Sequence, residues 1–106
     1  MAEERSVSRI DELRQQIDAI DTRLVELLSA RAACALAIGH EKKLAGLEVY
    51  QPSREAEVLG HVQQINTGPL DNEAMKRLFE RIIDEARRLE RLADAEQEAQ
   101  RDDSLT

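Results

Sequence analysis

Aromatic residues are almost absent from this chain of 106 residues: Tyr50 and Phe79 are the only two, and there is no tryptophan. Charged residues, by contrast, make up 35 % of the sequence. This balance is typical of long helices and coiled coils, and it argues against a β-sandwich or a barrel. The composition therefore favours an all-helical protein.

Other absences restrict the kind of protein further. Cys34 is the single cysteine, so no internal disulfide can form. No apolar run approaches the roughly 18 residues that span a bilayer, and the first nine residues lack the apolar stretch of a secretion signal. The net charge of −7 argues against nucleic-acid binding, which needs a basic surface. We expect a cytoplasmic protein without a membrane or nucleic-acid partner, and any anion that it binds should be small.

A long first helix is predicted from Val7 to about Ala45, because apolar residues recur there at alternating steps of three and four and no proline interrupts them. Gly46 is placed to end this helix in a left-handed C-cap. A helix of about 39 residues is roughly 58 Å long. In a single small chain much of its apolar stripe would lie in water, so a second copy of the chain is the simplest cover.

Two shorter helices should follow. Pro52 and Ser53 signal the start of the second, whose apolar face extends to Ile65. Asp71 can cap the third, which we expect over residues 72–95.

The predicted fold is therefore all-α, with one long and two shorter helices per chain in an interlocked homodimeric bundle. We expect one domain over residues 1–106, with an ordered core over about 7–95. Residues 96–106 form a polar tail with little to bury, and they should fray.

Several charged residues fall on the apolar faces of these helices. Arg31 continues the spacing of Leu27 and precedes Ile38 on the same face, and Lys42 follows one turn later. On the third helix Glu90 continues the apolar face. Such residues can form internal salt bridges or extend to solvent, but the inward cations outnumber the inward carboxylates. A small dianion would complete the neutralisation.

The segments "LRQQIDAIDTRLVELLSARAACALAIGHEKK", "VYQPSREAEVL" and "NTGPLDNEAMKRLFERIIDEARRLE" together resemble the all-helical chorismate mutases. The resemblance is strongest to the mutase module of the bifunctional chorismate mutase–prephenate dehydratases, and it covers about residues 10–92. It implies three helices per chain, two interlocked chains, and two active sites that each take residues from both chains. It also implies that the chain converts chorismate to prephenate in phenylalanine and tyrosine biosynthesis, without a cofactor or metal.

The resemblance further implies a set of site residues. Lys42 and Glu90 would contact the ether oxygen of chorismate, and Arg31 would hold a carboxylate as the third catalytic residue. The implied substrate-binding set is Arg14, Arg31, Lys42, Gln51, Arg54, Glu55 and Glu90.

Within this set, Arg14 would reach in from the other chain and Glu55 would contact the ring hydroxyl. Gln51 departs from the common pattern, in which an aspartate is often found at this position.

Two alternatives remain open from the sequence. Isochorismate–pyruvate lyases share the helical scaffold and a cationic pocket, so a lyase is the enzymatic alternative. A non-catalytic helical dimerisation module is the other, and it would require the inward cations to be paired internally.

Overall fold

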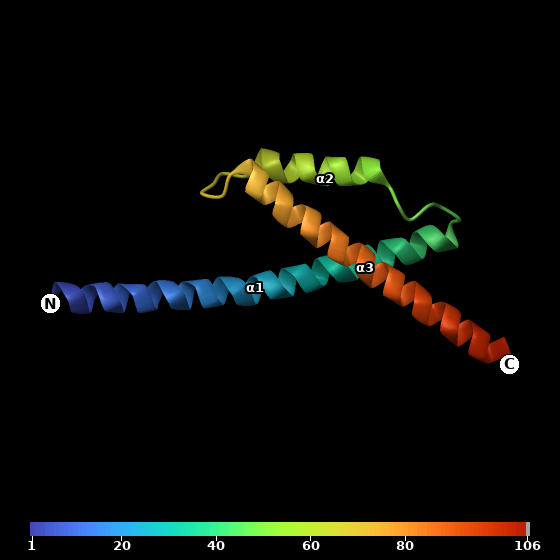
Figure 1. Ribbon diagram of the computed structural model, residues 1–106, viewed down its shortest axis with the longest axis horizontal. Coiled ribbons are helices and arrows are strands. Elements are labelled where there is room, and N and C mark those ends of the chain that lie inside the picture. Colours follow the sequence, from blue (N-terminus) through green and yellow to red (C-terminus); the bar gives the residue numbers. More distant parts are fainter. Residues whose placement is uncertain (106) are drawn as a thin grey trace. The chain divides into compact units, whose positions relative to one another are not determined.

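A computed structural model describes residues 1–105, with side chains described through residue 102. The chain forms three helices, α1 (Ala2–Leu44), α2 (Pro52–Ile65) and α3 (Asn72–Leu105), and the described residues contain no strand (Figure 1). The all-α prediction with three helices is therefore confirmed. The chain divides into two compact units, one over Met1–Arg31 and the other from Ala32 onward. None of the described helices is long and apolar enough to cross a membrane.

The end of α1 is fixed by a glycine, as the sequence predicts. Gly46 has a φ of 71°, a left-handed conformation that costs other residues about 1–2 kcal/mol. The amide of Gly46 donates to the carbonyl of Lys43 at 3.1 Å, and that of Leu47 donates to the carbonyl of Lys42 at 2.8 Å. This pair of hydrogen bonds is the Schellman motif, which satisfies the last carbonyls of the helix and turns the chain back toward α2.

The two other helices also begin where the sequence predicts. Pro52 is the first residue of α2, a position where its missing N–H is not needed. Asp71 caps α3, because its Oδ1 accepts a hydrogen bond from the amide of Ala74 at 2.6 Å. The connection before Asp71 is held by Asn66, whose side-chain amide donates to the carbonyl of Leu70 at 2.8 Å.

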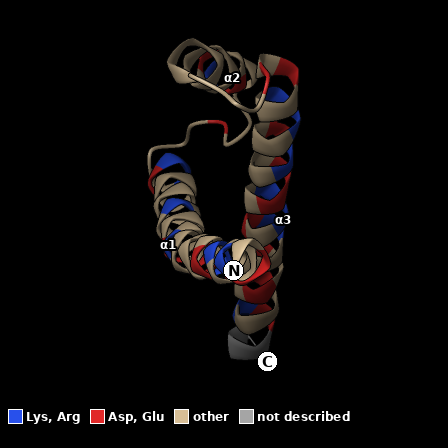
Figure 2. Ribbon diagram, turned by 90° about the vertical axis from the view of Figure 1, so that its left-hand side faces the viewer, with Lys and Arg blue, Asp and Glu red and all other residues tan. Residues whose placement is uncertain are grey.

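Two helix ends differ from the prediction. The third helix does not stop near Ala95 but continues to Leu105. Residues 91–105 contain neither glycine nor proline and are rich in Ala, Glu, Gln and Arg, so their helix propensity extends the helix. Figure 2 shows acidic and basic residues interleaved along α3. The first helix begins at Ala2 rather than Val7, and Glu3 and Glu4 lie in its first turn, where acidic side chains are favoured.

The core of the second unit lies between α2 and α3, which pack against each other. Val62 of α2 is 5 % exposed and is the one buried hydrophobic side chain among the described residues. Phe79 and Ile83 of α3 are half-buried, as is Leu59 of α2. This packing fixes the N-terminal half of α3 against α2, and so it sets the relative positions of side chains from the two helices.

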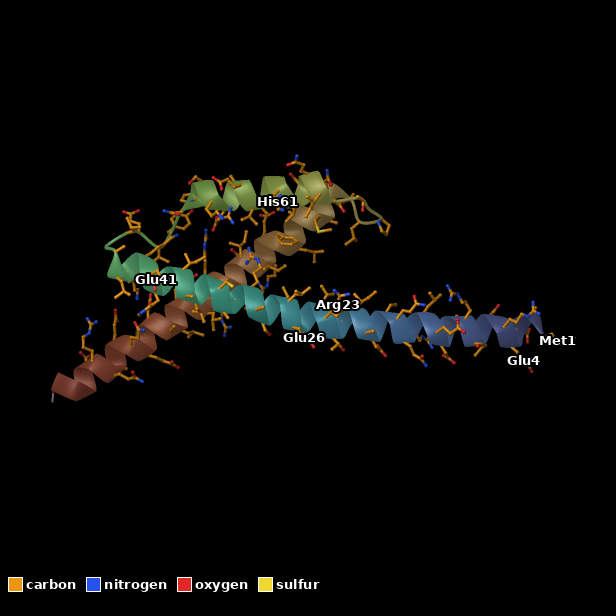
Figure 3. All side chains as sticks on the ribbon, turned by 180° about the vertical axis from the view of Figure 1, so that it is seen from behind. Met1, Glu4, Arg23, Glu26, Glu41 and His61 are labelled. Atoms are coloured by element: carbon orange, nitrogen blue, oxygen red, sulfur yellow. The ribbon has the colours of Figure 1, made fainter. Side chains whose placement is uncertain are left out.

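The first unit is a single stretch of helix without a core of its own. Its side chains project on all sides, with Arg23 and Glu26 among them (Figure 3). The apolar stripe predicted from the sequence is exposed within this unit: the exposed fraction is 45 % at Ile10, 55 % at Ile17 and 61 % at Leu27. An apolar face of this length is unusual on a chain that functions alone.

Candidate functional site

Lys42 lies in the last turn of α1, next to the connection that leads to α2. Its ammonium group donates to the backbone carbonyl of Val49 at 3.3 Å and to the side-chain oxygen of Gln51 at 3.1 Å. Both acceptors are neutral, and no described carboxylate forms an ion pair with Lys42. Since an ammonium has three N–H donors, one is left for a ligand. The two hydrogen bonds hold a cation whose charge no ion pair neutralises.

Glu90 lies on α3 and packs against the C-terminal part of α1. A Cβ added at Gly39 would lie 3.7 Å from the Cδ of Glu90, so the glycine brings the helix backbone close to this carboxyl group. Burial raises the pKa of Glu90, and it outweighs the nearby ammonium of Lys42, which lowers that pKa. The charge of Asp94 raises the pKa further, and the guanidinium of Arg87 lowers it. Glu90 therefore keeps its proton to a higher pH than an ordinary glutamate, and in that form it can donate a hydrogen bond.

An ion pair joins the same two helices. Lys43 of α1 pairs with Asp94 of α3, one turn beyond Glu90. A cavity of about 50 Å³ lies here, lined in part by Gly39, Glu90 and Asp94. A volume of this size admits a water molecule or two, whereas sites for small organic ligands are several times larger. This cavity by itself is therefore too small for an organic substrate.

Glu55, in the first turn of α2, interacts with Arg87, a residue that was not predicted from the sequence. Its carboxylate forms an ion pair with Arg87 of α3, and both side chains are about one-third exposed, at 29 % and 32 %. The guanidinium of Arg87 also lies over the ring of Tyr50, 4.5 Å from the ring centroid. Arg87 therefore links α2, α3 and the connection that precedes α2.

The three predicted arginines differ in their exposure and in their partners. Arg54 is exposed and pairs with Glu57 one turn later at 3.2 Å. Arg14 and Arg31 both belong to the first unit. Arg14 is exposed, with Asp11 at 3.9 Å, whereas Arg31 is half-buried and forms no ion pair with a carboxylate of that unit.

The structure thus brings part of the predicted set together. Lys42 donates a hydrogen bond to the side-chain oxygen of Gln51, and its charge lowers the pKa of Glu90. The signal for Arg87 was present in the sequence, because steps of four and three from Ile83 to Glu90 pass through residue 87 as well as through Ala86. No group of three or more potential metal ligands occurs within the described part of the chain.

An ammonium group and a protonated carboxyl group on neighbouring helices form a pair of hydrogen-bond donors suited to an oxygen that gains negative charge. Such an arrangement is chemically suited to binding a small anion and to stabilising charge that develops on it.

The family model described as chorismate mutase type II matches residues 13–91, and the chain belongs to this family. The bifunctional chorismate mutase/prephenate dehydratases of Stutzerimonas stutzeri and Pseudomonas aeruginosa are 43 % and 45 % identical to the chain over 83 residues. Each alignment covers 74 % of this chain and 23 % of the relative, so the chain spans about a quarter of the length of these curated relatives.

Among solved structures, chorismate mutase (Form II) from Thermus thermophilus superposes with a TM-score of 0.76 at 34 % identity. That match covers 78 % of this chain and 94 % of the other. The family model and the structural match therefore agree on the same family.

Proposed function

We propose that the protein is a chorismate mutase, which rearranges chorismate to prephenate for the synthesis of aromatic amino acids in the cytoplasm. The observation that carries this proposal is the pair formed by Lys42 and Glu90. One is a cation held by neutral oxygens, and the other is a carboxyl group whose pKa is raised by burial. Membership of the chorismate mutase type II family supports it.

The reaction explains why such a pair is useful. In this Claisen rearrangement the C–O bond of the enolpyruvyl ether breaks while a C–C bond forms to the ring, within one molecule and without a net proton transfer. Negative charge develops on the ether oxygen as the C–O bond lengthens. Donors from Lys42 and Glu90 that are already in place stabilise this charge without reorganisation, an effect typically worth about 10²–10³-fold in rate per donor. The reaction needs no cofactor.

The remaining residues would bind and orient the substrate. Arg31 and Arg54 hold its two carboxylates, and fixing both folds the flexible side chain over the ring. Glu55 accepts a hydrogen bond from the ring hydroxyl. Gln51 acts mainly through Lys42, since its side-chain oxygen fixes the position of the ammonium group.

The active form in this proposal is a homodimer whose sites are shared between chains. Arg14 and Arg31 are seventeen residues apart on one stretch of helix, a separation of about 26 Å. A small dianion cannot bridge that distance, so Arg14 would serve the site of the other chain. The apolar stripe of the first unit would supply the contact surface for a second copy, and the exposure of Ile17 and Leu27 supports this part of the proposal.

Sedimentation velocity tests the assembly. We expect a dimer at micromolar concentration, because a folded monomer would leave the stripe in water. A folded monomer with full activity would contradict both the dimer and the sharing of Arg14.

The activity is tested by following the loss of chorismate spectrophotometrically and identifying the product. Prephenate is the expected product, and Arg31→Ala should reduce its formation by several orders of magnitude while the helical content is retained. Release of pyruvate from isochorismate, with no turnover of chorismate, would instead identify an isochorismate–pyruvate lyase. No turnover of either substrate by the folded protein would favour a non-catalytic module.

A further inference from the structure

Arg87 is a half-buried cation to which the proposed mechanism gives no role. We propose that Arg87 is a positioning residue that holds the carboxylate of Glu55 in place to accept a hydrogen bond from the ring hydroxyl of the substrate. This inference rests on the proposed function, and it adds a residue that acts on the substrate through Glu55.

The ion pair between Arg87 and Glu55 differs from the surface pairs of this protein. It joins α3 to α2, and its two side chains are 32 % and 29 % exposed. The pair of Arg54 with Glu57, by comparison, joins residues of one helix that are 68 % and 67 % exposed. Solvent screens a half-buried pair less than an exposed one, and a pair between two packed helices restricts both side chains. Arg87 therefore limits the orientations that Glu55 can adopt.

The guanidinium of Arg87 is itself held from a second side. It lies over the ring of Tyr50, 4.5 Å from the centroid, which is within the range of a cation–π contact. With Glu55 and Tyr50 as its partners, Arg87 is fixed between α2 and the connection that precedes it. A side chain engaged in this way is better suited to orient Glu55 than to bind a substrate carboxylate directly.

The pairing leaves Glu55 able to bind a hydroxyl group. Arg87 contacts Oε1, and no described residue donates a hydrogen bond to Oε2. A carboxylate offers about four acceptor positions and, when ionised, no donor. The free oxygen therefore suits a group that donates, such as an alcohol, and an oriented acceptor binds it at a lower entropic cost than a mobile one.

Arg87→Met tests the inference, with Arg88→Met as the matched control. Arg88 is the neighbouring arginine on α3, is 65 % exposed and pairs with Glu85 at 3.7 Å, so its replacement removes the same charge without touching Glu55. Rates are compared on the low-pH plateau, where Glu90 stays protonated in every variant.

A hydrogen bond made equally in the ground state and the transition state changes KM more than kcat. We therefore expect Arg87→Met to raise the KM for chorismate about tenfold with kcat within about twofold, a loss in the range of one charged hydrogen bond. Arg88→Met should leave both constants unchanged. Arg87→Lys keeps the charge but not the planar fork, and it should restore part of the lost affinity.

Two further comparisons separate positioning from simple stabilisation of the fold. In the double variant Arg87→Met with Glu55→Gln, KM should be no higher than in Glu55→Gln alone, because both changes remove the same interaction. With a chorismate analogue that lacks the ring hydroxyl, the penalty of Arg87→Met should vanish. If Arg87→Met fails to fold, as judged by circular dichroism, Arg87→Gln replaces it in the same experiments.

Equal KM values for Arg87→Met and Arg88→Met would overturn the inference, as would additive effects with Glu55→Gln or a penalty that persists with the analogue. These results are distinguishable from failure of the proposed function. A wild-type protein without activity on chorismate refutes the function itself, whereas an active wild type with an unaffected Arg87→Met variant refutes only the role of Arg87.

Discussion

The pH dependence of catalysis should report the protonation of Glu90. Burial raises the pKa of this carboxyl group, the charge of Asp94 adds to that effect, and Lys42 and Arg87 oppose it. The net direction is upward, so the acid form persists above the usual range of a glutamate. Because only the acid form donates a hydrogen bond, activity should be constant below the raised pKa. Above it, activity should fall about tenfold for each pH unit, as for a single ionisation.

The variant Glu90→Gln separates donation from titration. Its amide N–H donates at every pH, so kcat/KM should stay within about tenfold of the wild-type plateau and lose the alkaline decline. Glu90→Ala removes the donor altogether and should cost about 10²–10³-fold at every pH. The measurement is kcat/KM for chorismate across the pH range in which all three proteins remain helical.

Two results would refute this reasoning. A wild-type profile that is flat over the whole pH range in which the protein remains helical would mean that no titrating donor limits the reaction. A decline in Glu90→Gln at the same pH as in the wild type would assign the ionisation to another group. In either case Lys42 would stabilise the ether oxygen without help from residue 90.

Three further changes test single contacts. Asp94→Asn removes a charge that raises the pKa of Glu90, so the alkaline limb of the rate profile should move to lower pH, and an unmoved limb would contradict this coupling. Gly39→Ala places a Cβ at ordinary contact distance from Glu90, so urea unfolding should show a gain of about 0.5–1 kcal/mol, whereas a loss would indicate tighter packing than described. Asp71→Ala removes the hydrogen bond to Ala74 and should cost about 1 kcal/mol in the same assay, with Asp71→Asn as the control that keeps the cap; equal losses would refute it.

Helix boundaries were predictable where a residue has a conformational reason to end or begin a helix. Each of the three residues acts on the backbone within a few residues of its own position. In the structure Gly46 ends α1, Pro52 begins α2 and Asp71 caps α3. The end of α3 was not predictable in this way. Residues 95–102 are exposed, and the expectation of a frayed tail gave burial more weight than the helix propensity of Ala, Glu and Arg.

The candidate site was predictable only in part. The spacing that placed Lys42 and Glu90 on inward faces is a property of one helix at a time. The pairing of Arg87 with Glu55 depends on how α2 and α3 pack, and two adjacent residues, Ala86 and Arg87, fit the spacing of α3 equally well. The spacing along α3 cannot distinguish between them, because the position of the Glu55 carboxylate on α2 determines which residue forms the contact.

The wide spacing of Arg14 and Arg31 along one helix has a genetic consequence if sites are shared as proposed. A chain that lacks Arg14 and a chain that lacks Lys42 are each inactive as homodimers, since every site then carries the lesion. In a mixed dimer both lesions fall in one site, and the other site receives Arg14 and Lys42 intact. Two such defective alleles can therefore complement each other in one cell. An Arg31 lesion and a Lys42 lesion cannot, because a chain contributes both residues to the same site. In a mixed dimer of these two variants each site contains one damaged residue, and no activity returns.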